Sequence, residues 1–525
     1  MTTQYPQLIR ALCDPARYPH PVRKVEVLET HISWVLLAGR YAYKIKKPVD
    51  LGFLDFSDLP KRRFFCEEEL RLNRRLAPSL YLATVAIGGS AEQPEIGREP
   101  AIEYAVKMRR FAVNKTLDHL FCRQALAPEH LDRLAQSLSA FHAALPPATA
   151  DSVYGTPAAV MAPVRQNFQQ LRSLLETADW PMLDRLETAC ETEYAAGAAL
   201  IGERRQQGRI RECHGDLHLG NIVLLRQRPV PFDGIEFAPE LRWIDPINDT
   251  AFLVMDLLQR GRGDLAYRFL NAYLEHSGDY AGLGLLRFYL SYRATVRAKV
   301  AGFRLAQSGD PAAKRECLAY LELASSCLTQ RKPALIVMHG LPGSGKSRVA
   351  RWLSQQYRLI RLRSDVERKR LFGLPPLASS RSATGGGIYR ADAGRQTYDR
   401  LLELSRNLLA AGFGVIVDAA FLQYDQRRPF RELAAQVGAG FVLVAVEAEP
   451  ATLHQRIIER QTAGNDASEA GLEVLEHARR NLEALQADET AGSVVFDNNA
   501  DRPAAEVNSE FRRQLAELAG LRAEP

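Results

Sequence analysis

Two short segments constrain this chain more than any other part of its sequence: HGDLHLGN at residues 214–221 and GLPGSGKS at residues 340–347. The second lies between an apolar, strand-like run and a helical run, which is the context of a loop that holds phosphate groups with backbone N–H donors. The first has the spacing of a phosphoryl-transfer loop of an unrelated kind. The chain is therefore predicted to hold two nucleotide-using parts in series.

The composition is that of a globular chain. Its 525 residues favour about two to four domains, and an apolar content of 46% is enough to bury sizeable cores. The net charge of +6 is small beside 68 basic and 62 acidic residues, so it does not point to nucleic acid. Seven cysteines without a CxxC pair argue against a zinc ribbon or a disulfide framework.

The same features predict a cytoplasmic protein without a membrane partner. The opening segment MTTQYPQLIRALCDP lacks a basic stretch followed by an apolar core. No run approaches the roughly 18 consecutive apolar residues of a membrane span. The scattered cysteines fit a reducing compartment.

The hydrophobic period divides the chain near TQRKP, residues 329–333. Before this point, short alternating runs predict strands and longer runs with helical spacing predict helices. After it, apolar strand candidates alternate with helical stretches, as in a doubly wound parallel sheet. We expect two domains that fold independently, 1–330 and 334–525. The strand candidates are 25–30, 32–39, 40–47, 103–111, 334–340, 359–365, 414–420, 440–448 and 493–499; the helix candidates include 61–77, 130–145, 264–307 and 347–357.

The 340–347 segment predicts a site for ATP and Mg²⁺. Glycines let backbone N–H groups turn toward phosphates, Lys346 supplies a positive charge to the β and γ groups, and the Ser347 hydroxyl can ligate Mg²⁺. The predicted nucleotide contacts are Gly340, Leu341, Pro342, Gly343, Ser344, Gly345, Lys346 and Ser347.

Four further residues of the C-terminal part are candidates for this site. Asp365, after a strand, could accept the proton of an acceptor hydroxyl or cap a helix. Asp418, after the apolar VIV, is a candidate for Mg²⁺ or a structural carboxylate. Arg456 and Arg460, one turn apart, could cover the phosphates or form a solvated helix face. The loop 375–387 is a mobile insertion or a segment that closes over substrate.

The 214–221 segment predicts the second site. Asp216 would orient or deprotonate an acceptor hydroxyl, and Asn221 and Asp233 would ligate Mg²⁺. His214 is expected to orient the loop rather than to react.

With these residues in place, 25–255 resembles aminoglycoside phosphotransferases and the related choline and homoserine kinases. The resemblance implies a bilobal protein-kinase-like fold, in which Lys44 holds the α and β phosphates, Glu69 pairs with it, and VKMRR at 106–110 contacts adenine. Lys46, Lys47, Glu67 and Glu68 compete for the first two roles. LETHIS at 28–33 has no GxGxxG, so Thr30, His31 and Ser33 would cover the phosphates instead.

Residues 335–497 resemble the P-loop kinases that include polynucleotide 5′-hydroxyl kinases, gluconate kinase and zeta toxins. The whole chain resembles a bacterial family in which an aminoglycoside phosphotransferase-like domain is fused to such a kinase. The resemblance implies two ATP-dependent kinase sites acting on hydroxyl groups, with the acceptors unidentified.

Two alternatives stay open. The first domain could be a non-catalytic nucleotide sensor that regulates the second. The P-loop domain could instead phosphorylate a nucleic-acid 5′ end, with the basic run ERKRL at 367–371 near its acceptor.

Overall fold

The computed structural model describes residues 5–50, 52, 54–330, 332–380, 382, 386–463, 466–499 and 509–521. Within it the chain forms two compact units: Met1–Leu134 with Ala144–Pro163 and Ile201–Leu253, and Ala135–Ala143 with Val164–Leu200 and Val254–Pro525. The predicted boundary includes Arg331, which lies outside the described residues, so the division at 330 stays a prediction. Positions 381 and 383–385 of the predicted loop lie outside them as well.

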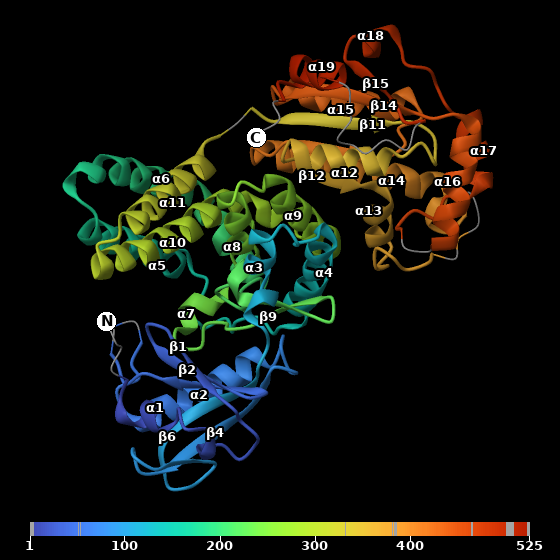
Figure 1. Ribbon diagram of the computed structural model, residues 1–525. Coiled ribbons are helices and arrows are strands. Elements are labelled where there is room, and N and C mark those ends of the chain that lie inside the picture. The colour runs from blue at the N-terminus through green and yellow to red at the C-terminus, as the bar shows by residue number, and fades with distance from the viewer. Residues whose placement is uncertain are drawn as a thin grey trace. The chain divides into compact units, whose positions relative to one another are not determined.

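An antiparallel sheet dominates the first unit, with the strand order β1-β2-β3-β6-β4-β5 (Figure 1). Helix α2 packs against β6 and β4. The sheet and its helices are β1 Val25–Glu29, β2 Ser33–Ala38, β3 Tyr41–Lys46, β4 Tyr81–Gly89, β5 Pro94–Ile96, β6 Ala101–Arg109, α1 Gln7–Ala11 and α2 Leu59–Asn73.

Side chains of β3 alternate between two cores. Tyr43 and Ile45 pack into a cluster with α1, whereas Ala42 belongs to a cluster with Cys66 of α2. Because neighbours in a strand point to opposite faces, residues 44 and 46 share the α2 side with Ala42. Local alternation thus places two lysines opposite one helix.

Two small antiparallel ladders, β7 with β10 and β8 with β9, flank the 214–221 and 232–236 segments in the first unit. The remaining elements that lie wholly in this unit are α3 Leu117–Cys122, β7 Arg211–Glu212, β8 Ile222–Leu225, β9 Arg228–Pro231, α7 Pro239–Arg242 and β10 Trp243–Ile244. Helices whose residues fall in both units are α4 Pro128–Ala144, α5 Pro157–Leu174, α6 Trp180–Gln206 and α8 Pro246–Gln259.

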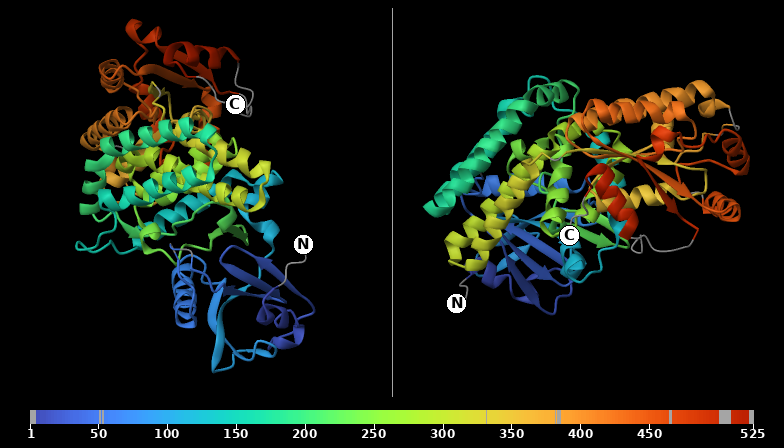
Figure 2. Two further views of the ribbon diagram at one scale, coloured as in Figure 1. Left: turned by 90° about the vertical axis from the view of Figure 1, so that its left-hand side faces the viewer. Right: turned by 90° about the horizontal axis from the view of Figure 1, so that it is seen from above.

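The second unit contains a five-stranded, fully parallel sheet in the order β12-β13-β11-β14-β15. Helices cover both of its faces (Figure 2): α12 and α19 share one core with β11 and β14, and α14 and α15 contact the other side. The doubly wound sheet is as predicted. Its strands are β11 Ala334–His339, β12 Ile360–Arg363, β13 Val415–Asp418, β14 Gly440–Glu447 and β15 Ser493–Asp497.

Every strand and helix range predicted from the sequence overlaps an element of the same type. The helices of the second unit are α9 Gly263–Ser277, α10 Leu286–Ser308, α11 Pro311–Leu328, α12 Lys346–Gln356, α13 Ser364–Leu371, α14 Ala391–Ala410, α15 Tyr424–Gln436, α16 Pro450–Ala463, α17 Leu472–Arg480, α18 Ala487–Thr490 and α19 Ser509–Ala519.

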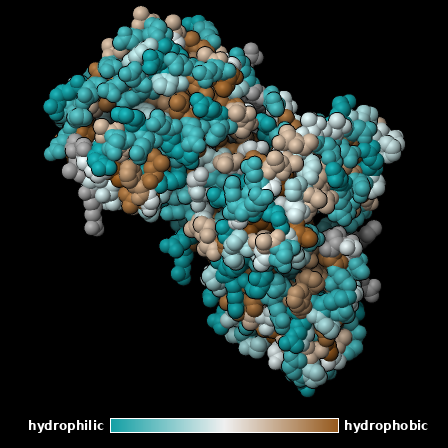
Figure 3. Space-filling model, turned by 180° about the vertical axis from the view of Figure 1, so that it is seen from behind, coloured by the Kyte–Doolittle hydropathy of each residue, from teal (hydrophilic) through white to brown (hydrophobic). Residues whose placement is uncertain are grey.

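The face of the molecule in Figure 3 is mostly hydrophilic, with apolar side chains in small separate groups. Among the described residues, no helix has both the length and the apolar character that crossing a membrane requires.

The core between α12 and the parallel sheet predicts a large effect of truncation. Leu353→Ala should lower the free energy of unfolding by about 2–5 kcal/mol, since the Leu353 side chain is fully buried and its loss leaves a cavity. Leu377→Ala is the control, because Leu377 is 54% exposed, and should change this free energy by less than about 0.5 kcal/mol. Urea titration of the full chain measures both. Equal effects would contradict this core.

Candidate active sites

Lys44 of β3 connects helix α2 to the Asp233 segment. Its Nζ donates to Glu69 Oε1 at 2.9 Å and to Asp233 Oδ1 at 2.6 Å. Burial alone would lower the pKa of Lys44, but the Asp233 and Glu69 carboxylates outweigh it and raise that pKa well above its ordinary value. A predicted phosphate-binding lysine, its predicted glutamate and a predicted metal ligand therefore meet at one point.

The geometry separates most of the competing assignments. Lys47 Nζ binds Glu29 Oε1 at 2.6 Å. Glu67 and Glu68 pair with arginines of their own helix, at 2.9 Å and 2.8 Å. Of the three consecutive glutamates, Glu69 is the one bonded to the β3 lysines.

Lys46 forms a second buried ion pair beside the first. Its Nζ donates to Glu69 Oε2 at 2.9 Å and also to Glu236 Oε1. Both Lys46 and Glu69 have fully buried side chains. Glu236 was not predicted from the sequence; its signal is a glutamate inside the apolar run that follows Asp233. Glu69 thus accepts one lysine on each oxygen.

The Asp216 loop is held by its own residues and by helix α8. Asn221 Nδ2 donates to Asp216 Oδ2 at 2.9 Å, which brings the predicted base and a predicted metal ligand together. The backbone N–H groups of Gly215 and His214 donate to Asp249 at 2.8 Å and 3.2 Å. Asp249 was also not predicted from the sequence. The one feature that could have indicated it is an aspartate in the mostly apolar helix α8.

Asp233 has a left-handed backbone, with φ of 62°. This conformation is uncommon for a residue with a side chain and is held here by two hydrogen bonds. The Asp233 N–H donates to the Tyr81 hydroxyl at 3.1 Å, and the Gly234 N–H donates to Asn73 Oδ1 at 2.8 Å. Helix α2 and β4 therefore fix the turn that presents the carboxylate.

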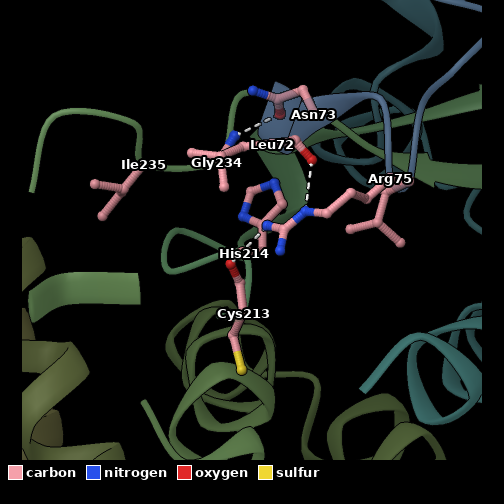
Figure 4. A pocket seen from close by; sticks show the side chains of 8 residues that line it. Leu72, Asn73, Arg75, Cys213, His214, Gly234 and Ile235 are labelled. Carbon is pink, nitrogen blue, oxygen red and sulfur yellow. Dashed lines mark hydrogen bonds between the residues drawn. The ribbon is translucent and has the colours of Figure 1, made fainter. Parts of the chain in front are cut away.

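His214 uses both ring nitrogens inside the protein. Nε2 donates to the Phe232 carbonyl at 2.9 Å, and Nδ1 accepts the Asp216 N–H at 3.3 Å. Burial lowers the pKa of His214, so the neutral ring is favoured. These contacts support an orienting role for His214. A small pocket lies beside it (Figure 4), lined by Leu72, Asn73, Arg75, Leu76, Cys213, His214, Gly234 and Ile235.

The turn between β1 and β2 is closed by its own hydrogen bonds. The Thr30 N–H donates to the Ser33 carbonyl, and the Ser33 N–H donates to Thr30 Oγ1, each at 2.9 Å. Thr30, His31 and Ser33 lie at this turn, and their contact with phosphates stays a prediction, as does that of 106–110 with adenine.

The glycine-rich loop of the second unit joins β11 to α12. Gly340 and Gly343 have φ of 137° and 84°, and a Cβ at these positions would lie 2.4 Å and 2.7 Å from backbone oxygens. Only glycine fits such close approaches without displacing the chain. Lys346 Nζ donates to the carbonyls of Gly340 and Leu341 at 2.7 Å and 2.8 Å. Burial lowers the pKa of Lys346 to about 8.

Ser347 and Asp418 meet at the ends of α12 and β13. Ser347 Oγ donates to Asp418 Oδ1 at 3.0 Å. Asp418 Oδ2 is buried and has no hydrogen-bond partner among the described residues. Burial raises the pKa of Asp418. A hydroxyl beside a carboxylate whose second oxygen is buried and accepts no hydrogen bond from a described residue fits a Mg²⁺ ion, which prefers oxygen ligands.

Asp365 is the second residue of α13, and the N-cap position belongs to Arg363. Its Oδ1 accepts from Arg368 Nη1 at 3.1 Å, and the Arg368 guanidinium lies 5.0 Å from the Tyr389 ring centre. The neighbouring Lys369 does not pair with Asp365; its Nζ lies 3.1 Å from Glu469 Oε1. The Asp365 carboxylate also acts electrostatically on Lys346 and favours its charged form, against the larger effect of burial, which lowers the pKa of Lys346.

Arg456 and Arg460 of α16 flank the same loop. Arg456 Nη2 donates to the Asn498 carbonyl at 2.9 Å, and Asn498 Nδ2 donates to the Ser344 carbonyl at 2.7 Å. Arg460 Nη2 donates to the Ala470 carbonyl at 2.6 Å and lowers the pKa of Lys346. Neither arginine lies on a purely solvated face; their lid role stays a prediction.

The two parts of the chain match two family models. Residues 63–286 match the "Phosphotransferase enzyme family" and residues 335–485 match an "AAA domain". The N-terminal domain is therefore aminoglycoside phosphotransferase-like, and the C-terminal domain is a P-loop kinase domain. Both are domains of phosphotransferases.

Over 457 residues the chain is 32% identical to uncharacterized proteins of Mycobacterium tuberculosis strain H37Rv and Mycobacterium bovis, covering 86% of this chain and 89% of each relative. The chain belongs to their family. An alignment of this length includes parts of both domains, so the fusion is common to the family.

Solved structures each match part of this chain. A choline/ethanolamine kinase family protein from Mesorhizobium loti has 14% identity, with 61% of this chain and 93% of that chain covered and a TM-score of 0.38. A gluconokinase from Sinorhizobium meliloti 1021 has 23% identity, with 36% and 96% covered and a TM-score of 0.26. Kti12 from Chaetomium thermophilum has 18% identity, with 35% and 100% covered and a TM-score of 0.27.

The low pKa of Lys346 predicts a pH-dependent nucleotide affinity. Phosphates favour the charged lysine, so its pKa rises on binding and the free protein must take up a proton near pH 8. About half of the free Lys346 side chains are charged at pH 8 and about a tenth at pH 9. The affinity for nucleotide should therefore fall about fivefold between pH 8 and pH 9. Calorimetry in two buffers, with Asp233→Ala to weaken the other site, measures this. Lys346→Arg should remove this pH dependence. A wild-type nucleotide affinity that is the same at pH 8 and pH 9 would contradict the prediction.

Proposed function

We propose that this chain is an ATP-dependent phosphotransferase with two separate sites, each transferring the γ-phosphoryl group to a hydroxyl acceptor. The observation that carries the proposal is that each unit gathers the same three kinds of group: a lysine that is buried (Lys44) or half-buried (Lys346), two oxygen ligands and a carboxylate. In the second unit Lys346 lies on the loop, and Ser347 and Asp418 are 3.0 Å apart.

At the P-loop site the chain's own groups divide the work. Mg²⁺, when bound by Ser347 and Asp418, neutralises phosphate charge. Lys346 exchanges two loop carbonyls for the β and γ phosphates. Asp365 accepts the proton of the acceptor hydroxyl, and Arg456 and Arg460 stabilise charge on the transferred group.

At the first site the same roles fall to residues from different elements. Lys44 binds the α and β phosphates while Glu69 keeps its position. Asn221 and Asp233 would hold Mg²⁺; in the structure Asp233 Oδ1 is 2.6 Å from Lys44 Nζ, and its second oxygen is not part of that contact. Asp216 orients the acceptor hydroxyl, and its bond with Asn221 links it to the metal site.

Two alternatives differ in measurable ways. A first unit that only senses nucleotide would leave a Lys346 variant without turnover, whereas an active first site would leave residual turnover. Transfer to a single-stranded oligonucleotide rather than to small metabolites would favour a nucleic-acid acceptor, and filter binding with such oligonucleotides tests this directly.

For the P-loop site, we predict different defects from two substitutions in a full chain carrying both Asp216→Ala and Asp233→Ala, which should remove turnover and weaken ATP binding at the first site. Lys346→Ala should abolish ATP turnover, because the phosphates lose their main side-chain cation. Asp365→Asn should leave ATP affinity within about twofold but lower transfer by about 10² or more, since it removes a base and little ground-state binding. Steady-state turnover and equilibrium binding of a fluorescent ATP analogue measure the two. Unchanged turnover with Lys346→Ala would refute the site.

For the first site, a full chain carrying Lys346→Ala isolates the remaining activity. Asp216→Ala should lower that activity by a factor of about 10² or more, while ATP still binds. Asp233→Ala should chiefly weaken Mg²⁺-dependent ATP binding, because it removes a proposed ligand. If both variants bind and turn over ATP like their parent, the first unit is not catalytic through this loop and the sensor alternative gains.

A further inference from the structure

Helix α9 meets the edge of the parallel sheet inside the second unit. Asn271 of α9 acts as a strand would: its Nδ2 donates to the Leu359 carbonyl at 2.9 Å, and its Oδ1 accepts the Arg361 N–H at 2.7 Å. Because Asn271 is buried, these bonds are shielded from water. They fix α9 in register with β12.

One turn further along α9, Glu275 is bonded to two arginines of β12. Its carboxylate accepts from Arg361 Nη2 and lies 3.4 Å from Arg363 Nη1. The side chains of all three residues are at most 14% exposed. Burial would raise the pKa of Glu275, but Arg361 and Arg363 outweigh it and lower that pKa. Glu275 is therefore a buried anion that compensates two buried cations.

Both arginines also lie close to the proposed Mg²⁺ ligands, Ser347 and Asp418. Arg361 Nη1 donates to the Ser347 carbonyl at 3.3 Å. Arg363 Nε lies 3.7 Å from Asp418 Oδ2, while its Nη2 donates to Asp466 at 3.1 Å. At 3.7 Å the Arg363 guanidinium is too far for a hydrogen bond to Asp418. The Asp418 oxygen thus accepts no hydrogen bond from Arg363, although the two groups lie within ion-pair distance.

We propose that Glu275 is a positioning residue of the P-loop site: by binding Arg361 and Arg363 it keeps the Arg363 guanidinium from closing on Asp418. Without Glu275, the two arginines have fewer carboxylates to share, and Asp418 becomes a favoured partner. A guanidinium on Asp418 would compete with Mg²⁺ for the same oxygen. This inference rests on the proposed nucleotide site, and it makes that site depend on a helix outside the P-loop fold.

The test compares Glu275→Gln with Glu193→Gln in a full chain carrying Asp233→Ala. Glu193 is a matched control: it pairs with Arg287 at 3.0 Å, and that arginine donates to the Ala411 carbonyl at 2.7 Å, without a bond to Asp418. The readout is the equilibrium affinity for a fluorescent ADP analogue, measured in EDTA and across a Mg²⁺ titration.

We expect Glu275→Gln to raise the Mg²⁺ concentration at half-saturation by roughly fivefold or more, as for members of one charge network, with the EDTA affinity nearly unchanged. Glu193→Gln should give the same Mg²⁺ concentration at half-saturation as its parent. Glu275→Asp should restore most of the Mg²⁺ affinity that Glu275→Gln loses. Equal losses with and without Mg²⁺, or a Glu275→Gln titration like the control, would overturn the inference. Failure of the nucleotide site itself looks different: the parent would then bind no more analogue than the same chain with Lys346→Ala.

Discussion

At both proposed sites, a lysine that is withdrawn from water is compensated by neighbouring groups of the protein. A lone ammonium in the interior is costly, so each site supplies a substitute partner. At Lys44 the substitutes are two carboxylates, and at Lys346 they are two backbone carbonyls. The rest of each site is built around these contacts.

The two solutions have opposite electrostatic results. Carboxylates hold Lys44 firmly charged, whereas carbonyls are dipoles and leave Lys346 with a pKa of about 8. In the first unit, Lys46 keeps Glu69 occupied on its second oxygen. If Lys44 exchanges Asp233 for phosphates, as proposed, helix α2 stays attached, because Lys46 still joins α2 to β3.

The features that could be predicted from the sequence are those that residues close together in the chain determine. Strand, glycine turn and helix around Lys346 are local, and so is the spacing that brings Asp216 to Asn221. The sequence could not single out Glu69 among three glutamates, because that choice depends on which face of α2 meets β3. Glu236, Asp249, Asn271 and Glu275 were missed for a related reason. Their partners are remote in sequence, 190 positions away for Lys46 and Glu236 and 86 for Arg361 and Glu275, and no local period encodes such pairs.

The two hydrogen bonds from Asn271 have a further consequence. Strand β12 is an edge of its sheet, and an open edge offers unpaired backbone groups to any other strand. Asn271 occupies part of this edge with a side chain that cannot propagate a ladder. A chain shortened to the P-loop fold would present that edge uncovered, beside Arg361 and Arg363 without their shared partner Glu275, and so would be prone to self-association. The helix that precedes the P-loop fold thus also covers part of the sheet edge that another strand could otherwise pair with.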